Sequence, residues 1–228
     1  MAQVHRIKCG NGNCYIIEGK EGSILVDTAR PKYREYILNE CKEKKVKLIV
    51  LTHTHMDHCQ NAQYISKELN IPVAISKSDE ELIESNMRQT LSAKTILGKI
   101  VLAVSLKSFN YDEIPEFKPE IYLQEGDTLE NYGVDASIIE LPGHTNGSIG
   151  IDIEGDGIIV GDALMNMFYP TVSMLYHDYN QMLESAKRIQ DLGDKIIYFG
   201  HGKPVRNKIW VKLLLLLKLN FYYTYSII

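Results

Sequence analysis

The sequence has few cysteines and lacks the spacing of a cysteine-based site. Four occur in 228 residues, at Cys9, Cys14, Cys41 and Cys59. A chain of this length, with 45% hydrophobic residues, can bury a sizeable core without a disulfide framework. Cys9 and Cys14 are too far apart in sequence for a redox or zinc pair, and no cysteine has zinc-finger spacing. We therefore expect four reduced thiols in a cytoplasmic protein.

Segments typical of secretion or membrane insertion are also missing. The N-terminal sequence MAQVHRIKCGNGN has no apolar stretch of the kind found in a secretory signal. The apolar segment 209–228 is interrupted by Lys212, Lys218 and Asn220, so no uncharged run reaches the length of about 18 residues that a transmembrane helix needs. We expect 209–228 to be a C-terminal helix or tail docked on the core. The alternative is an interfacial helix that touches a membrane.

Positive charge is not in excess. The chain has 25 Lys and Arg against 29 Asp and Glu, which gives a net charge of −4. This balance gives no support for broad electrostatic binding to nucleic acid. We expect a small-molecule substrate and no nucleic-acid partner, and we leave a homodimer open.

What the sequence does contain is an alternation of β-branched runs and helix-like stretches. Strands are expected at 4–9, 14–18, 23–26, 47–51, 73–75, 121–123, 136–141, 148–153, 157–160 and 195–199. Helices are expected at 31–45, at 58–69 and after Asp178, where Gln181 completes a capping-box pattern. Strand clusters appear in both halves, each followed by helices. The pattern predicts a single α/β domain over 1–228, with two similar sheets and helices outside them in an αββα sandwich.

The segment 78–119 differs from the rest of the chain. It is rich in helix formers and apolar residues and has little turn chemistry. We expect a helical insertion of two helices that borders the functional site. Its apolar faces have two interpretations: packing against the core or a second subunit, or a lid that forms an apolar substrate pocket.

Histidines concentrate in one short segment. His53, His55 and His58 fall within six residues, directly after the apolar run 48–51. A strand that ends there would deliver the cluster to a loop at one edge of a sheet. One His-x-His pair is a weak signal, because such pairs also occur on ordinary surfaces, but the six-residue cluster is more specific.

Three other segments repeat this arrangement. His144, Asp162 and His201 each follow an apolar run and lie beside glycine, which lets the backbone turn sharply. If these strands run the same way in packed sheets, their ends meet at one edge. Five of the seven histidines would then converge.

The converging residue types indicate a metal centre. Imidazole nitrogen and carboxylate oxygen are ligands suited to zinc, iron or manganese. In extended chain His53 and His55 point the same way and can hold one ion, while Asp57 and His58 continue around the loop toward a second. The number of ligands exceeds the four of a closed structural zinc site and suits two adjacent divalent ions. The candidate ligands are His53, His55, Asp57, His58, His144, Asp162 and His201.

These motifs resemble those of the metallo-β-lactamase superfamily. The match comprises H-x-H-x-D-H at 53–58, G-H-T-x-G-S at 143–148, the pair at 161–162 and G-H-G at 200–202. The resemblance implies the metallo-β-lactamase fold, with the metals between the two sheets at one edge. It implies that His53, His55 and His144 hold one ion, that Asp57, His58 and His201 hold the other, and that Asp162 bridges them. It also implies a structural role near the site for Asp27.

Within the superfamily, the motifs look most like those of glyoxalase II-type hydrolases, which cleave thioesters or other acyl bonds. The stretch between His58 and His144 is longer than that pattern needs, and we find no match to its glutathione-binding basic residues. We therefore expect cleavage of a thioester, ester or lactone of a small substrate by hydroxide bound to two metal ions, with zinc favoured over iron or manganese. Asp57 is the candidate catalytic residue, which would pass a proton to the leaving group.

Alternatives of other classes remain open. A mononuclear iron dioxygenase similar to the persulfide dioxygenases would use similar ligands around one Fe(II). A phosphodiesterase of the same fold would use the same ions for in-line phosphoryl attack. A non-catalytic binding module is disfavoured because the ligand set is complete. Flavodiiron oxidoreductases are disfavoured because their pattern has Glu in place of His55.

Overall fold

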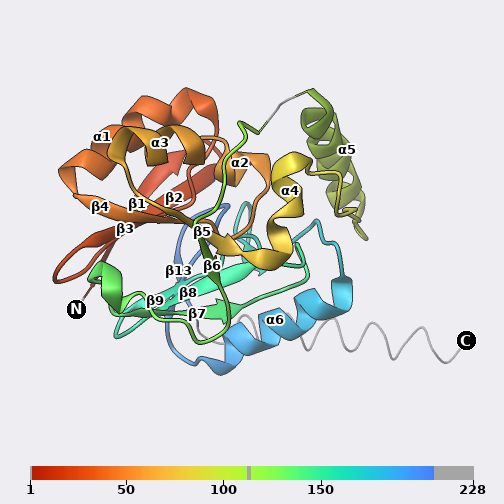
Figure 1. The fold of residues 1–228 in the computed structure, drawn as a ribbon. Helices are drawn as coiled ribbons and strands as arrows, with labels where there is room; N and C mark the ends of the chain where they lie inside the picture. Colours follow the sequence, from red (N-terminus) through yellow and green to blue (C-terminus); the bar gives the residue numbers. More distant parts are fainter. Residues whose placement is uncertain (1, 112–113, 208–228) are drawn as a thin grey trace, which may run out of the picture.

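The computed structural model describes residues 2–111 and 114–207, which form two facing β-sheets with helices on their outer sides (Figure 1). The first sheet has the order β1-β2-β3-β4-β5-β6 and the second β13-β12-β9-β8-β7. The strands of the first sheet are β1 (Gln3–Cys9), β2 (Gly12–Glu18), β3 (Ser23–Val26), β4 (Val46–Val50), β5 (Val73–Ser76) and β6 (Ile121–Leu123). Those of the second are β7 (Ala136–Glu140), β8 (Ile149–Ile153), β9 (Gly157–Ile159), β12 (Ile196–Tyr198) and β13 (Val205–Arg206).

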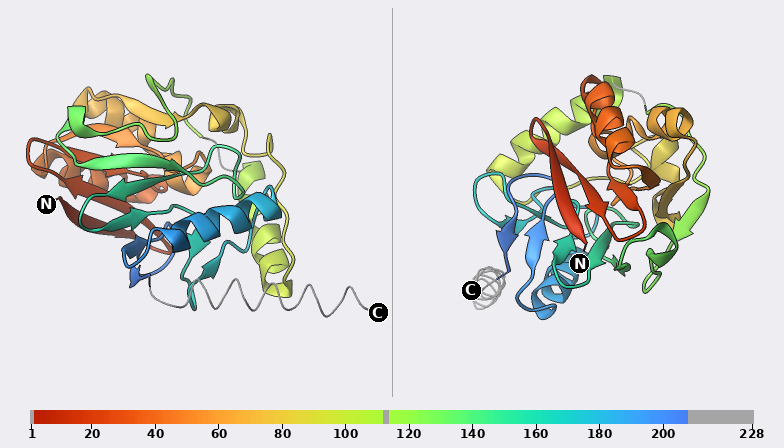
Figure 2. Two further views of the ribbon diagram at one scale, coloured as in Figure 1. Left: turned by 90° about the horizontal axis from the view of Figure 1, so that it is seen from below. Right: turned by 90° about the vertical axis from the view of Figure 1, so that its left-hand side faces the viewer.

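Helices cover the outer faces of both sheets (Figures 1 and 2). Helices α1 (Arg34–Glu43) and α3 (Ala62–Leu69) lie outside the first sheet, and α6 (Tyr179–Asp191) lies outside the second. The described residues also form three short 3₁₀ helices: η1 (Pro31–Tyr33), η2 (Lys77–Asp79) and η3 (Glu130–Tyr132). The αββα sandwich predicted from the sequence is confirmed.

Strand direction in the first sheet follows from its connections. The hairpin β1–β2 turns through two residues, and Gly10 adopts a φ of 70° that suits a tight antiparallel turn. Strands β3, β4, β5 and β6 run parallel to one another, because each connection between them is a crossover over the face of the sheet. The carboxyl ends of these strands therefore lie at one edge.

The second sheet reaches the same arrangement by a different route. β7, β8 and β9 form an antiparallel meander, and β12 then pairs parallel to β9. As a result β7, β9 and β12 all run in one direction. The loops that follow these three strands lie together at one edge of the sheet.

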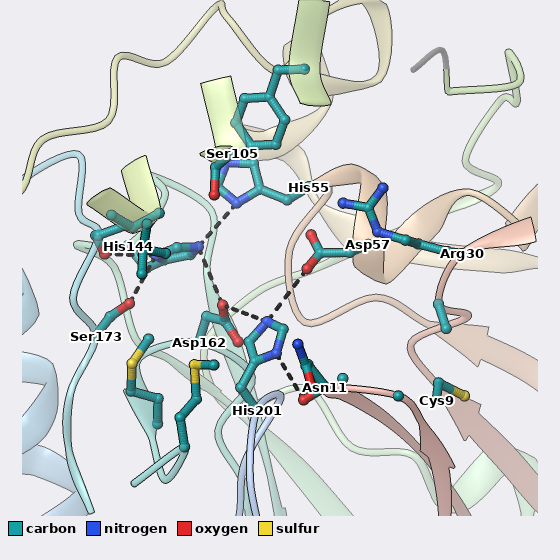
Figure 3. Close-up of a pocket in the computed structure, with 18 of the residues that line it drawn as sticks. Cys9, Asn11, Arg30, His55, Asp57, Ser105, His144, Asp162, Ser173 and His201 are labelled. Carbon is teal, nitrogen blue, oxygen red and sulfur yellow. Dashed lines mark hydrogen bonds and ion pairs between the residues drawn. The ribbon is translucent and has the colours of Figure 1, made fainter. Parts of the chain in front are cut away.

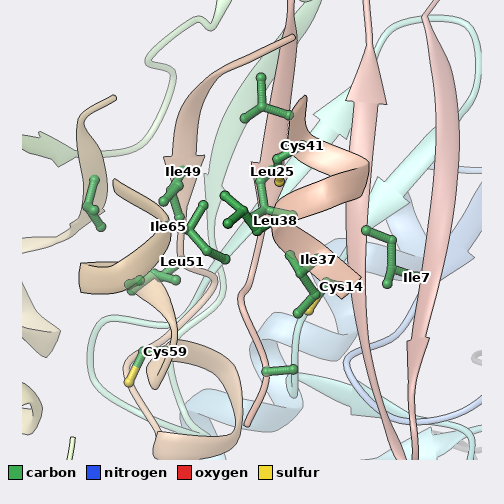
Figure 4. Packing of buried hydrophobic residues seen from close by; sticks show 14 of the residues in the cluster. Ile7, Cys14, Leu25, Ile37, Leu38, Cys41, Ile49, Leu51, Cys59 and Ile65 are labelled. Atoms are coloured by element: carbon green, nitrogen blue, oxygen red, sulfur yellow. The ribbon is translucent and has the colours of Figure 1, made fainter. Parts of the chain in front are cut away.

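Alternation along the strands divides the apolar side chains among three cores. In β3, Leu25 faces the core under α1 and α3, which also contains Ile37 and Ile65 (Figure 4). Its neighbours Ile24 and Val26 face the core between the two sheets. A third core lies between the second sheet and α6. Packing on both faces fixes the sheets, and therefore fixes the edge where the polar loops meet.

One predicted helix is interrupted. The expected helix 58–69 divides into α2 (Met56–Cys59) and α3. The backbone N–H of Asn61 donates to Thr28 Oγ1 at 3.3 Å, and its side-chain amide donates to carbonyls of the loop after β3. The helix is interrupted at Asn61 because its backbone N–H donates to the side chain of Thr28, and its side chain binds the same loop.

The segment 78–119 contains two helices, as expected, but the first is short. α4 (Glu81–Glu84) is a single turn, and α5 (Ile96–Tyr111) is the long helix at the edge of the molecule (Figure 1). A hairpin of β10 (Leu164–Met165) and β11 (Thr171–Val172), and strand β13, were not anticipated. The predicted tail at 209–228 lies outside the described residues. Within those residues, every helix is too short or too polar to cross a membrane.

The predicted cap of α6 generates a test. The Asp178 carboxylate accepts hydrogen bonds from the N–H groups of Asn180 at 2.8 Å and Gln181 at 3.0 Å. We expect Asp178→Ala to lower the free energy of unfolding by about 1 kcal/mol, because both donors lose their acceptor. Urea unfolding measures the effect. Glu184→Ala, at an exposed position of the same helix, should change it by less than about 0.5 kcal/mol. Equal stabilities of wild type and D178A would contradict the role of the cap.

Candidate metal centre

The loop after β4 brings three imidazoles together at the edge where the parallel strands end. The ring centroids of His53 and His55 lie 4.9 Å apart, and those of His53 and His58 lie 4.2 Å apart. All three rings are buried. Buried aromatic rings usually pack against apolar groups, whereas here they pack against one another.

The second sheet contributes three further groups from its own edge (Figure 3). The ring centroid of His144, after β7, lies 4.8 Å from that of His53. Asp162 follows β9, and its Oδ2 lies 3.3 Å from Nε2 of His201, which follows β12. Asp57 lies in α2, and its Oδ2 is 3.4 Å from Nε2 of His201. The loops of both sheets therefore face one another, and the structure brings together all seven residues singled out in the sequence.

The seven residues form three overlapping groups. Within each group, the potential ligand atoms lie within 4.8 Å of one another. The groups are His53, His55 and His144; Asp57, His58 and His201; and His53, His58 and Asp162. The first two share no member, and the third links a residue of each to Asp162. The geometry can therefore hold a metal ion in each of two adjacent positions.

Four of the imidazoles are oriented through their Nδ1 atoms. The Nδ1 partners are Thr52 Oγ1 for His53 at 3.1 Å, Asp27 Oδ2 for His58 at 2.8 Å, Leu175 O for His144 at 2.8 Å and Asn11 O for His201 at 3.1 Å. A ring held at Nδ1 directs Nε2 away from that partner. Partners of this kind set the tautomer and orientation of metal-binding histidines.

Several polar atoms at the centre have no protein partner. Among the described residues, Nε2 of His53, His55 and His58 and Oδ1 of Asp162 are buried without a hydrogen bond. Each such atom costs about 1–3 kcal/mol when left unsatisfied. The ligand atoms of His53, His58 and Asp162 lie within 4.8 Å of one another, so one cation would satisfy these three residues together. His55 faces His144 through Nδ1, which lies 3.0 Å from Nε2 of His144. Imidazole nitrogens and carboxylate oxygens fit zinc, iron or manganese.

The protonation of the rings follows from their surroundings. Burial, together with the neighbouring imidazoles, holds the pKa of His53 well below its usual range and lowers the pKa of His55 to about 3. Burial also opposes the charged form of His58, but the Asp27 and Asp162 carboxylates outweigh it and raise its pKa to about 9. His53 and His55 therefore present neutral nitrogens at neutral pH, which is the form that binds a metal.

Comparison with known proteins identifies the family. The model of the metallo-beta-lactamase superfamily matches residues 7–201. The chain belongs to the metallo-β-lactamase superfamily. It is therefore a metallo-hydrolase by family, with His and Asp groups able to bind a metal.

Individual relatives agree with this family. The hydroxyacylglutathione hydrolase GloC of Haemophilus influenzae is 26% identical over 196 residues, which cover 83% of this chain and 85% of that protein. The probable metallo-hydrolase MJ0888 of Methanocaldococcus jannaschii is 26% identical, over 85% of this chain and 88% of that protein. The crystal structure of TTHA1623 in a di-iron-bound form superposes with a TM-score of 0.67 at 22% identity, covering 90% of this chain and 95% of that one.

Asp27 holds two loops of the candidate metal centre in position. It is buried, adopts a φ of 61°, and accepts hydrogen bonds from Thr52 N at 2.8 Å and from Thr52 Oγ1. Its Oδ2 also holds His58. One carboxylate thus joins the end of β3 to the loop after β4.

Asp79 has a similar supporting role that sequence reasoning missed. Its Oδ2 accepts from Thr54 N at 3.2 Å and Thr145 Oγ1 at 2.8 Å, and its Oδ1 accepts from Gly147 N at 2.7 Å. Asp79 therefore connects the loop of His53 and His55 to that of His144. The sequence feature that could have identified Asp79 is its position three residues after β5, at the edge where the other candidate ligands follow their strands.

A cavity of about 310 Å³ opens beside the seven residues. Val101, Ser105 and Phe109 of α5 form part of its wall, and the Phe109 ring centroid lies 5.3 Å from that of His55. Cys59, in contrast, is buried away from the cavity, and burial raises the pKa of its thiol. The long helix of the segment 78–119 thus borders the site.

Burial of Asp79 predicts a pH dependence of stability. Burial raises its pKa to about 6, against hydrogen bonds from Thr145, Gly147 and Thr54 that lower it. Because this pKa exceeds the unfolded value near 3.9, the folded state gains stability as the pH falls from 7 to 5. Relative to Asp79→Asn, which cannot titrate there, wild type should gain about 1 kcal/mol over this interval.

Urea unfolding of the metal-free proteins at pH 5, 6 and 7 measures this difference. Other titrating groups are common to both proteins and cancel. A difference that stays constant with pH would show that the pKa of Asp79 is not raised.

Proposed function

We propose that this protein is a dinuclear metal-dependent hydrolase that cleaves the acyl bond of a small thioester, ester or lactone. The observation that carries the proposal is the pair of three-residue ligand groups beside one cavity, joined through Asp162. Similarity to a hydroxyacylglutathione hydrolase supports acyl cleavage over phosphoryl transfer. Four free, buried cysteines support a cytoplasmic location.

In this proposal each ligand group holds one ion. His53, His55 and His144 hold the first, Asp57, His58 and His201 hold the second, and Asp162 lies between them. We favour zinc, because neutral imidazoles and carboxylates suit it and it needs no redox partner. The di-iron form of TTHA1623 supports a two-ion centre in this fold and keeps iron as the rival metal. Two such ions, when bound, polarise a carbonyl group and supply an activated water at neutral pH.

Asp57 is the proposed proton carrier. Its carboxylate lines the cavity, and Oδ2 lies 3.4 Å from Nε2 of His201. Burial favours the neutral acid, but His201 and His58 outweigh it and hold the pKa of Asp57 well below its usual range. Asp57 is thus ionised and able to accept a proton at neutral pH, then to donate it to the departing group.

The apolar wall favours an acyl substrate. Val101 and Phe109 of α5 line the cavity together with Met165 and Leu175. Side chains of this kind bind a hydrocarbon chain and exclude water from the reacting carbon. We propose that α5 acts as the lid over this pocket.

Removal of a ligand should remove metal and activity together. We expect His55→Ala and Asp162→Ala to lower metal content and to reduce kcat/KM by at least about 100-fold, because the metal supplies the nucleophile. Elemental analysis and hydrolysis assays measure the two effects. His5→Ala removes an imidazole that pairs with Glu18 away from the centre, and serves as the control. Wild-type metal content and turnover in either ligand variant would refute the assignment.

The reaction class is tested with purified protein of known metal content. We expect two zinc ions per chain and turnover of thioester or lactone substrates faster than phosphodiesters by at least about ten-fold. One iron per chain, with oxygen uptake on a persulfide, would instead establish the dioxygenase alternative. Faster phosphodiester cleavage would establish the phosphodiesterase alternative.

A further inference from the structure

The loop between β3 and α1 is held in a strained conformation beside the metal centre. Asp27 and Ala29 both adopt positive φ values, of 61° and 54°, which are unfavourable for residues with a Cβ atom. The buried Asn61 amide stabilises this path by donating to Thr28 O at 2.7 Å, Ala29 O at 3.2 Å and Arg30 O at 2.9 Å. Strain of this kind persists where surrounding contacts impose it, and it is often found at functional sites.

The strained loop places Arg30 at the cavity wall. The Arg30 side chain is half-buried and extends toward the carboxylate of Asp57 (Figure 3). Its Nη1 donates to Ser108 Oγ of α5 at 3.2 Å, so the guanidinium lies between the metal-binding loop and the lid helix. Lys32 also lines this wall, with Nζ 4.9 Å from the ring centroid of Tyr33. This wall therefore carries two cationic side chains.

The cavity lining combines basic and apolar side chains. Arg30 and Lys32 are its basic residues besides the histidines, and its apolar residues include Leu91, Val101, Phe109, Met165 and Leu175. Among the described residues that line the cavity, the acidic ones are Asp57 and Asp162, both at the candidate metal centre. Two divalent ions there would add to the positive potential of Arg30 and Lys32.

We infer that Arg30, assisted by Lys32, is a specificity residue that binds a carboxylate on the leaving group of the substrate. The guanidinium fork matches a carboxylate in a bidentate pair, and the apolar lining residues would hold the acyl chain. This inference rests on the proposed acyl hydrolysis. In that reaction water adds to the thioester carbonyl, the C–S bond breaks, and the products are a carboxylic acid and a thiol that has taken up the remaining proton.

A purely structural role for Arg30 makes a different prediction. If Arg30 serves only to hold α5 through Ser108, its loss should affect anionic and neutral ligands equally. If it binds the carboxylate, its loss should affect the anionic ligand selectively. A matched pair of ligands that differ only in charge separates the two roles.

Binding is measured first, without turnover. The probes are the thioether S-butyl-3-mercaptopropionate and its neutral amide, titrated calorimetrically into zinc-loaded protein. We expect the carboxylate to bind wild type at least about ten-fold more tightly than the amide, because hydrogen bonds to charged groups are stronger than those to neutral groups. Arg30→Gln should remove most of this preference, and Lys32→Gln a smaller part. Lys67→Gln, which removes an exposed lysine of α3 outside the cavity lining, should retain it.

The outcomes are distinct. The inference would be overturned if wild type bound the carboxylate and the amide with equal affinity. It would also be overturned if R30Q kept the preference for the carboxylate, through direct contact with zinc. The corresponding thioesters, S-butanoyl-3-mercaptopropionate and its amide, are then assayed for hydrolysis. Failure of wild type to cleave either one would refute the proposed function, while the binding ratio would still decide the role of Arg30. If the proposed hydrolysis and the proposed role of Arg30 are both correct, R30Q lowers kcat/KM at least about ten-fold more for the anionic substrate than for the neutral one.

Discussion

At the edge between the two sheets, Nε2 of His53 and His58 and Oδ1 of Asp162 are buried without a hydrogen-bond partner among the described residues, and the ligand atoms of these residues lie within 4.8 Å of one another. In the deprotonated form that binds a metal, the imidazole lone pairs and the negative charge of the carboxylate repel one another in a medium of low dielectric constant. A cation is the partner that reverses this repulsion. The geometry of the site and the chemistry proposed for it both depend on that interaction.

The surrounding structure holds these groups in position through shared strand direction and a few buried polar contacts. Strands β3, β4 and β5 are parallel to one another, and so are β7, β9 and β12 in the other sheet. The six loops that follow these strands therefore begin at one edge of the sandwich. Asp27 and Asp79 then tie these loops to one another, the first within one sheet and the second between the sheets. Asn61 adds the loop of Arg30 to the same network.

Much of this arrangement was predictable because it is encoded locally. Short apolar runs identified the strands, and His or Asp residues soon after a strand identified the candidate ligands, since strand ends are where loops gather polar groups. The break before α3 was not predictable, because it depends on contacts between Asn61 and a loop distant in sequence. Asp79 and Arg30 were missed for the same reason: neither belongs to a motif, and each makes its hydrogen bonds with residues more than 20 positions away.

The central claim is that seven side chains form one centre for two ions. Anomalous diffraction from crystals of metal-loaded protein, recorded on both sides of the metal absorption edge, tests it most directly. The account predicts two peaks, one beside His53, His55 and His144 and one beside Asp57, His58 and His201, with Asp162 between them. A single peak, or peaks bound by other residues, would contradict it.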